Sequence, residues 1–197
     1  CNNINFREAY KKEPLLTQIN RVADAVARVA YETMQGMRYH EWVPIKSAQE
    51  ETTLGVRLPT KEEAARAGKE LESAERMPDG QLRHRDDIYC RETVLMQHFS
   101  PQTNLLIQAH NIGGLGVVAI PCEVFVEIGL DIKKRSPLKP TFTISLANGY
   151  NGYLPTPEHH ALGGYETWRA RSSYLETNAS PKIVETVMRL LQQMSRE

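Results

Sequence analysis

The sequence predicts an α/β protein with layers of mixed β-sheet flanked by helices. Segments with apolar residues at three- and four-residue steps, the helical spacing, alternate with short β-rich runs. Two of those runs are separated by Gly113-Gly114, as in a β-hairpin. Strands interspersed with helices bury their apolar surfaces by packing in layers. At 197 residues the chain fits one domain, or part of a larger one, with a substantial core.

The first half predicts two helices on either side of an extended segment. Residues 14–36 carry apolar side chains on one helical face, with Pro and Gly suited to the first turn and the stop. Residues 42–58 show partial alternation of apolar side chains, as in a strand. Thr60 and Glu63 form a capping box for a helix to about Arg76. That helix is charged almost all round, so we expect it at the surface.

The second half predicts a series of strands and helices after a turn at 77–80. Apolar periodicity and flanking Gly and Pro residues define them. In order, we expect a helix over 85–98, strands over 104–112 and 115–120, a helix from about 123 to 134, a strand over 141–147 and a final helix from Ser180.

Composition excludes several classes of protein. The 24 basic and 24 acidic residues cancel, so no nucleic-acid or membrane surface driven by charge is indicated. The longest apolar run, around 115–120, is the length of a strand and too short to span a bilayer. Three cysteines provide neither a disulfide framework nor a metal-binding CxxC pair, and the cellular compartment stays open.

The segment NGYNGYLPTPEHHALGGYE, at 148–166, has the densest chemical content. We expect a loop of about nineteen residues, and loops of that length are often functional. Its glycines allow close approach to a ligand, and it offers phenol, carboxylate and imidazole groups. These groups belong to Tyr150, Tyr153, Tyr165, Glu158, Glu166, His159 and His160. A surface loop whose tyrosines pack on the core explains the same composition.

Glu123 follows a predicted strand and begins a predicted helix. Ligands in α/β proteins bind at the carboxyl ends of strands, and zinc accepts carboxylate oxygen alongside imidazole. A carboxylate that stabilises the helix dipole is the alternative. Cys1 places a thiol beside an α-amine, the arrangement of N-terminal-nucleophile hydrolases, with a trimmed terminus as the alternative.

Several motifs resemble the neutral/alkaline (non-lysosomal) ceramidase family and its bacterial relatives. Residues 121–125, Pro-Cys-Glu-Val-Phe, are similar to a Pro-Gly-Glu-Phe-like junction with Cys122 in place of Gly. Residues 148–153 resemble an Asn-x-Tyr-x-x-Tyr loop, and Tyr165-Glu166 resembles a later Tyr-Glu pair. Residues 2–5 look like a variant of a Gly-Asp-Val-Ser-Pro-Asn-like stretch near the family's active site. Residues 1–197 thus resemble the C-terminal part of a ceramidase-like catalytic domain, most strongly over 103–195.

The resemblance implies a zinc-dependent amide hydrolase. Glu123 and Tyr153 would bind zinc, Tyr165 would contact the substrate carbonyl or the tetrahedral intermediate, and Tyr150 and Asn2 would bind substrate. The family's two zinc-binding histidines are not recognisable here. We expect them on an upstream chain of the same precursor, cut before Cys1 to give a two-chain enzyme and a completed fold. Only the resemblance suggests a secreted or periplasmic location.

Two other functions stay open. Cys1 could attack the substrate in an N-terminal-nucleophile amidase with a degenerate metal site, or it could lie near or on the metal. The chain could also be a non-catalytic binding module that kept the fold. The substrate could be an N-acyl amide, a peptide-like amide or a sugar-linked amide.

Overall fold

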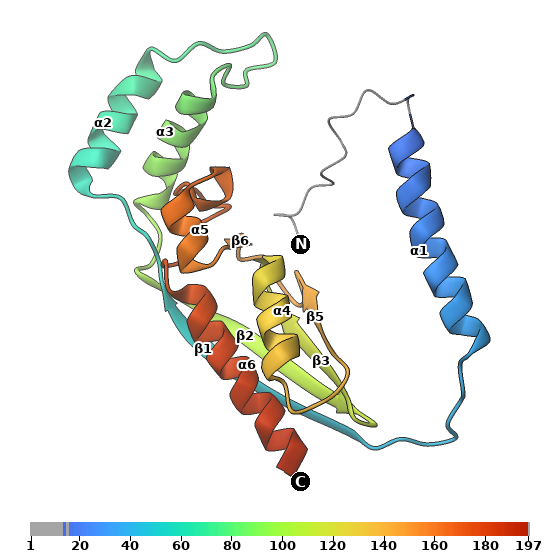
Figure 1. The fold of residues 1–197 in the computed structure, drawn as a ribbon. Helices are drawn as coiled ribbons and strands as arrows, with labels where there is room; N and C mark the ends of the chain where they lie inside the picture. Colours follow the sequence, from blue (N-terminus) through green and yellow to red (C-terminus); the bar gives the residue numbers. More distant parts are fainter. Residues whose placement is uncertain (1–13, 15, 197) are drawn as a thin grey trace.

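The computed structural model describes Pro14 and residues 16–196 of the chain (Figure 1). Helices and strands alternate through most of this length. In chain order they are α1 (Thr17–Gln35), β1 (Ile45–Gly55), α2 (Lys61–Glu72), α3 (Arg85–Met96), β2 (Gln102–Ile112), β3 (Leu115–Ile120), β4 (Glu123–Val124), α4 (Val126–Arg135), β5 (Thr141–Ser145), β6 (Tyr153–Leu154), α5 (Pro157–Leu162), the short 3₁₀-helix η2 (Tyr165–Thr167) and α6 (Ala179–Arg196).

The main sheet has four strands in the order β1-β2-β3-β5. β1 pairs with β2 and β2 with β3 in antiparallel fashion, whereas β3 and β5 are parallel. The β2–β3 connection is the predicted hairpin, and both Gly113 and Gly114 have positive φ angles, which glycine adopts without steric cost. A second, two-stranded parallel sheet joins β4 to β6. The predicted α/β class with a mixed sheet flanked by helices is therefore confirmed.

Helices α4 and α6 cover one face of the main sheet (Figure 1). Alternate residues of β2, Leu105, Ile107 and Ala109, are buried on that face. They belong to one apolar cluster with residues of α6 such as Ile183 and Leu191. Burial of each leucine or isoleucine side chain in this cluster contributes about 1.5–3 kcal/mol. This packed layer supports the strand ends from which β4 and β6 follow.

Helices α2 and α3 pack against each other beyond the end of β1. Thr60 and Glu63 form the predicted capping box, with the Thr60 hydroxyl accepting from the Glu63 amide at 3.1 Å. The helix ends at Glu72 rather than near Arg76, because Arg76 pairs with Leu82 across the turn. The helix lies at the surface as expected, and within it only Ala64 and Ala67 are buried.

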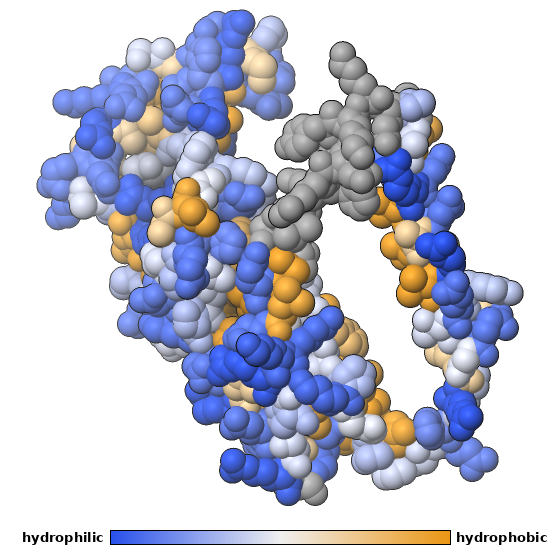
Figure 2. All heavy atoms as spheres, viewed as in Figure 1, coloured by the Kyte–Doolittle hydropathy of each residue, from blue (hydrophilic) through white to orange (hydrophobic). Residues whose placement is uncertain are grey.

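Helix α1 confirms the helix predicted over residues 14–36, although it begins at Thr17. It lies apart from the sheet, and none of its residues is buried (Figure 1). Its apolar side chains, including those of Ile19 and Val26, are exposed on one side of the helix (Figure 2). No helix in the described part of the chain is both long enough and apolar enough to cross a membrane.

The predicted loop at 148–166 is more ordered than expected. It contains strand β6, helix α5 and the start of η2. Helix α5 begins because Thr156 accepts from the His159 amide and Pro157 occupies the first helical position. The prediction of an unstructured loop was therefore wrong, since a hydrogen-bonded strand and a capped helix fix most of the segment.

Candidate active site

The β4–β6 pairing brings Glu123 and Tyr153 side by side. The two residues are direct partners in the parallel register. The Glu123 amide donates to the Gly152 carbonyl at 2.9 Å, and the Phe125 amide donates to the Leu154 carbonyl at 3.4 Å. Adjacent strands lie about 4.8 Å apart, and residues in register point to the same face. A carboxylate and a phenol are thus held on one rigid platform.

This pairing corrects the position predicted for Glu123. The residue lies on a strand, and α4 begins three residues later at Val126, with Phe125 as its N-cap. The side chain therefore does not act as an acid in the first turn of that helix. The sequence could not indicate this, because the partner strand is only two residues long and lies about thirty positions away.

The loop before β6 is fixed by Asn151 and Gly152. The amide and the side-chain Nδ2 of Asn151 both donate to the Pro121 carbonyl, at 2.9 and 3.0 Å. The Tyr174 hydroxyl donates to Asn151 Oδ1 at 2.6 Å. Gly152 has a φ of 72°, and a Cβ atom there would lie 2.3 Å from the Ser172 carbonyl oxygen. Only glycine fits this approach, so the Asn-Gly pair sets the direction of Tyr153.

Tyr165 reaches the same place from η2. Its ring meets the ring of Tyr153 edge-to-face, with centroids 5.7 Å apart and planes at 87°. The end of η2 is anchored by Arg57, which donates to the Thr167 carbonyl at 2.8 Å and to the Ser173 carbonyl at 2.6 Å. The Arg57 side chain also donates to the Leu175 carbonyl at 2.9 Å. One guanidinium therefore ties together the segment that carries Tyr165.

Hydrogen bonds and charge interactions link four side chains in one cluster. Burial raises the pKa of the Tyr153 phenol well above its usual value, and a hydrogen bond with Tyr165 and the charge of Glu123 act in the same direction. Burial also raises the pKa of Tyr150, followed by the charge of Glu123 and a hydrogen bond to it. We call Glu123, Tyr150, Tyr153 and Tyr165 the tyrosine cluster. Its Tyr150 and Tyr153 phenols stay protonated near neutral pH, so they can donate hydrogen bonds to an anion.

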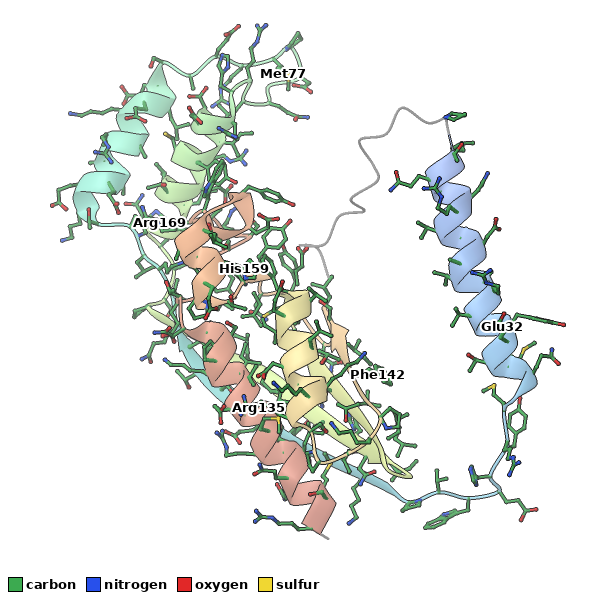
Figure 3. All side chains as sticks on the ribbon, viewed as in Figure 1. Glu32, Met77, Arg135, Phe142, His159 and Arg169 are labelled. Carbon is green, nitrogen blue, oxygen red and sulfur yellow. The ribbon has the colours of Figure 1, made fainter. Side chains whose placement is uncertain are left out.

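The two adjacent histidines are occupied by structural contacts. His159 lies on α5 (Figure 3). It packs edge-to-face on Phe125 at 4.9 Å between centroids, and its Nδ1 lies 2.8 Å from the Thr156 hydroxyl. Its Nε2 lies 3.7 Å from a carboxylate oxygen of Glu127. Burial, then the charge of Arg57, lowers the pKa of His160. These contacts explain His159 as part of the packing of α5.

The metal-binding groups are incomplete in the described part of the chain. Glu123 and Tyr153 supply two oxygen donors, but no group of three His, Cys, Asp or Glu side chains within Pro14 and residues 16–196 could hold a metal ion. Cys122 is fully buried in the core, where burial raises its pKa to about 12. Cys1 and Asn2 lie outside the described residues.

A pocket of about 470 Å³ opens beside Tyr150. The sequence did not predict this pocket, because α3 meets residues that lie some 80 positions further along the chain. Its charged and aromatic lining residues are Arg85, Tyr89, Arg91, Glu92, Tyr150 and Arg171. Arg171 forms two side-chain hydrogen bonds to Glu92, at 2.7 and 2.9 Å. The pocket thus combines aromatic walls with several guanidinium groups.

The fold is similar to that of a known hydrolase. Neutral ceramidase from Pseudomonas aeruginosa matches over 98% of this chain and 35% of its own, with a TM-score of 0.59 and 16% sequence identity. A ceramidase complexed with C2 is 22% identical over 48% of this chain and 15% of its own, with a TM-score of 0.43. The chain thus spans about a third of the length of the Pseudomonas ceramidase. No protein-family model and no curated protein matches it.

Proposed function

We propose that this chain is part of a zinc-dependent hydrolase of amide (N-acyl) bonds, with the tyrosine cluster at its reaction centre. The observation that carries the proposal is the β4–β6 bridge, which pairs Glu123 with Tyr153, together with the contact between Tyr153 and Tyr165. Residues about thirty and twelve positions apart in the sequence therefore converge at one point. The fold likeness to a ceramidase supports an amide as the substrate.

Tyr165 is the group that we assign to the substrate carbonyl. Its side chain is 52% exposed, so it is accessible to a ligand, while its ring is held by Tyr153. A hydroxyl that donates to the carbonyl oxygen stabilises the negative charge that develops there during hydrolysis. Tyr150, also exposed, lies next to Glu123 and would orient the substrate beside that carboxylate.

The donor set fits part of a zinc site. Carboxylate oxygen is a common zinc ligand, and the neighbouring phenol of Tyr153 would supply a second oxygen. When bound, zinc would lower the pKa of a water molecule and polarise the amide carbonyl. Catalytic zinc usually has three protein ligands, so at least one more residue must join Glu123 and Tyr153.

We assign the further ligands to histidines of an upstream chain from the same precursor. The match to 35% of the Pseudomonas ceramidase leaves room for such a chain, since about two thirds of that protein has no counterpart here. Asn2 would then contribute to the substrate site.

Metal content and hydrolysis test the proposal together. The protein produced from the complete gene should contain zinc by mass spectrometry and release the acid and the amine from N-acyl amides. Glu123→Gln keeps the size of the side chain but removes its charge. It should lower both zinc content and hydrolysis by about tenfold or more, since even residues that only orient metal ligands have effects of that size.

Glu158→Gln is the matched control. This carboxylate lies in the same chemically rich segment but is exposed on α5. It should change neither zinc content nor hydrolysis. Full activity without zinc, or full activity in Glu123→Gln, would overturn the proposal. Loss of activity in Cys1→Ala in a metal-free enzyme would instead support an N-terminal nucleophile.

A further inference from the structure

The pocket beside Tyr150 adjoins the tyrosine cluster through shared residues. Tyr150 lines the pocket and interacts with Glu123. Tyr89 also lines the pocket, and burial raises its pKa, with a smaller contribution in the same direction from the nearby Tyr165. A substrate whose carbonyl contacts Tyr165 would therefore extend the rest of its structure toward this pocket.

The pocket lining carries more positive than negative charge. Three guanidinium groups, those of Arg85, Arg91 and Arg171, face one carboxylate, that of Glu92. Glu92 accepts two bonds from the Arg171 side chain, one from the Arg171 amide at 3.2 Å and one from Arg91 at 3.1 Å. These contacts lower the pKa of Glu92 to about 2, so the carboxylate keeps its charge. The lining as a whole remains positive.

Arg85 supplies positive charge that Glu92 does not neutralise. Its guanidinium lies over the Trp168 ring, 4.7 Å from the centroid. Its Nε lies 3.8 Å from a carboxylate oxygen of Asp86, and the two side chains are largely exposed, at 69% and 92%. Such an exposed, loosely paired contact stabilises little. A cation in the first turn of α3 also interacts unfavourably with the helix dipole, so the charge of Arg85 does not stabilise this helix.

We propose that this pocket binds an anionic group of the substrate, a carboxylate or a phosphate, and that Arg85 selects for it. Arg presents a planar fork of donors that matches either oxyanion, and the Trp168 ring holds that fork in place. Tyr89 and Tyr150 supply apolar walls for the carbon chain next to the anion. The proposal rests on the amide hydrolase proposed above and narrows its substrates to acidic N-acyl amides. Hydrolysis adds one water across the C–N bond and releases a carboxylic acid and an amine that carries the carboxylate or phosphate group.

Three probes with the same acyl chain test the selection. N-hexanoylglycine carries a carboxylate, N-hexanoyl-O-phosphoethanolamine carries a phosphate, and N-hexanoylethanolamine is neutral. Calorimetry with the protein from the complete gene should show at least one anionic probe binding about tenfold more tightly than the neutral one, as expected for hydrogen bonds to a charged group. The anionic probe that binds more tightly shows whether the pocket prefers a carboxylate or a phosphate. Hydrolysis of all three is measured in parallel.

Arg85→Gln should remove this preference and leave the affinity for N-hexanoylethanolamine unchanged. Arg28→Gln, on the exposed surface of α1, is the matched control and should retain the preference. Equal binding of all three probes, or a preference that persists in Arg85→Gln, would overturn the inference even if every probe is hydrolysed. Binding of an anionic probe through Arg85 with no hydrolysis of any probe would support the anion site and refute the amide hydrolase.

Discussion

The rings of Tyr153 and Tyr165 meet edge-to-face, with their centroids 5.7 Å apart. The first ring is fixed by a β-bridge to Glu123, and the second belongs to a short helix that Arg57 anchors. Contact between the rings holds the exposed hydroxyl of Tyr165 in position, because aromatic pairs of this geometry contribute about 0.5–1.5 kcal/mol beyond their buried area. The two roles of Tyr165, ring packing and hydrogen bonding, can therefore be separated by mutation.

Tyr165→Phe keeps the ring and removes the hydroxyl. We expect the unfolding free energy to change by less than about 1 kcal/mol, since the side chain is half exposed. Hydrolysis should fall by about 10²–10³-fold if the hydroxyl stabilises the oxyanion. Steady-state kinetics and urea unfolding measure the two effects. Tyr39→Phe, at an 88% exposed position, is the control and should change neither quantity.

The sequence predicted most elements of the fold, because most of the longer helices and strands carry their own periodicity. Residues 104–112 and 115–120 show this for the hairpin, and Thr60 with Glu63 shows it for a helix start. The motifs also indicated Glu123, Tyr150, Tyr153 and Tyr165 as candidate site residues. They did not indicate how the four side chains lie relative to one another. The β4–β6 bridge could not be predicted, since two-residue strands have no period and their pairing depends on tertiary contacts. The pocket lined by α3 was missed because its other lining residues, such as Tyr150 and Arg171, lie far along the chain.

Gly152→Ala should destabilise the protein and disturb the site. The backbone has a φ of 72°, and the new methyl group would lie 2.3 Å from the Ser172 carbonyl oxygen. The left-handed conformation alone costs about 1–2 kcal/mol. The clash with backbone adds to this, because the Tyr153 amide donates to that same carbonyl at 2.8 Å. Thermal and urea unfolding should show a loss well above that of the control.

Gly80→Ala provides that control. Its φ of 82° carries a similar conformational cost, but no atom lies within 4 Å of the added Cβ. We expect a loss of about 1–2 kcal/mol from conformation alone. Equal losses for the two variants would show that the approach of Gly152 to Ser172 relaxes without strain.

The buried Glu92 predicts a loss of stability in acid. Its side chain is 8% exposed, and hydrogen bonding to Arg171 lowers its pKa from 4.5 to about 2. A carboxylate with a depressed folded-state pKa stabilises the fold above its unfolded pKa, and that stabilisation is lost as the pH falls toward 2. The full contribution is on the order of 3 kcal/mol. Glu92→Gln should therefore unfold more easily than the native protein at pH 7, with a smaller difference at pH 3.

Urea unfolding at both pH values measures this difference. Glu158→Gln, which changes an exposed carboxylate, separates the effect of Glu92 from that of the general rise in positive charge. A gap between the native protein and Glu92→Gln that is the same at pH 7 and pH 3 would contradict the assigned pKa.

Arg57→Lys should loosen the segment that carries Tyr165 without removing a charge. The guanidinium donates to the carbonyls of Thr167, Ser173 and Leu175 and to the Ser173 hydroxyl. An ammonium group has three donors on a flexible stem and cannot match this fork, so some of these acceptors lose their partner. Each buried acceptor left unsatisfied costs about 1–3 kcal/mol. We expect a stability loss of about that size and faster amide exchange at Thr167 and Trp168, whose amides bond within the η2 turn.

The same variant distinguishes positioning from substrate contact. Arg57 donates to backbone carbonyls of the segment and acts on Tyr165 only through that segment, so a lysine there should weaken hydrolysis by displacing the phenol. In the background of Tyr165→Phe, where the hydroxyl is already absent, Arg57→Lys should cause little further loss of activity although it still lowers stability. Independent, multiplicative losses in the double mutant would instead mean that Arg57 affects the reaction by a route other than the placement of Tyr165.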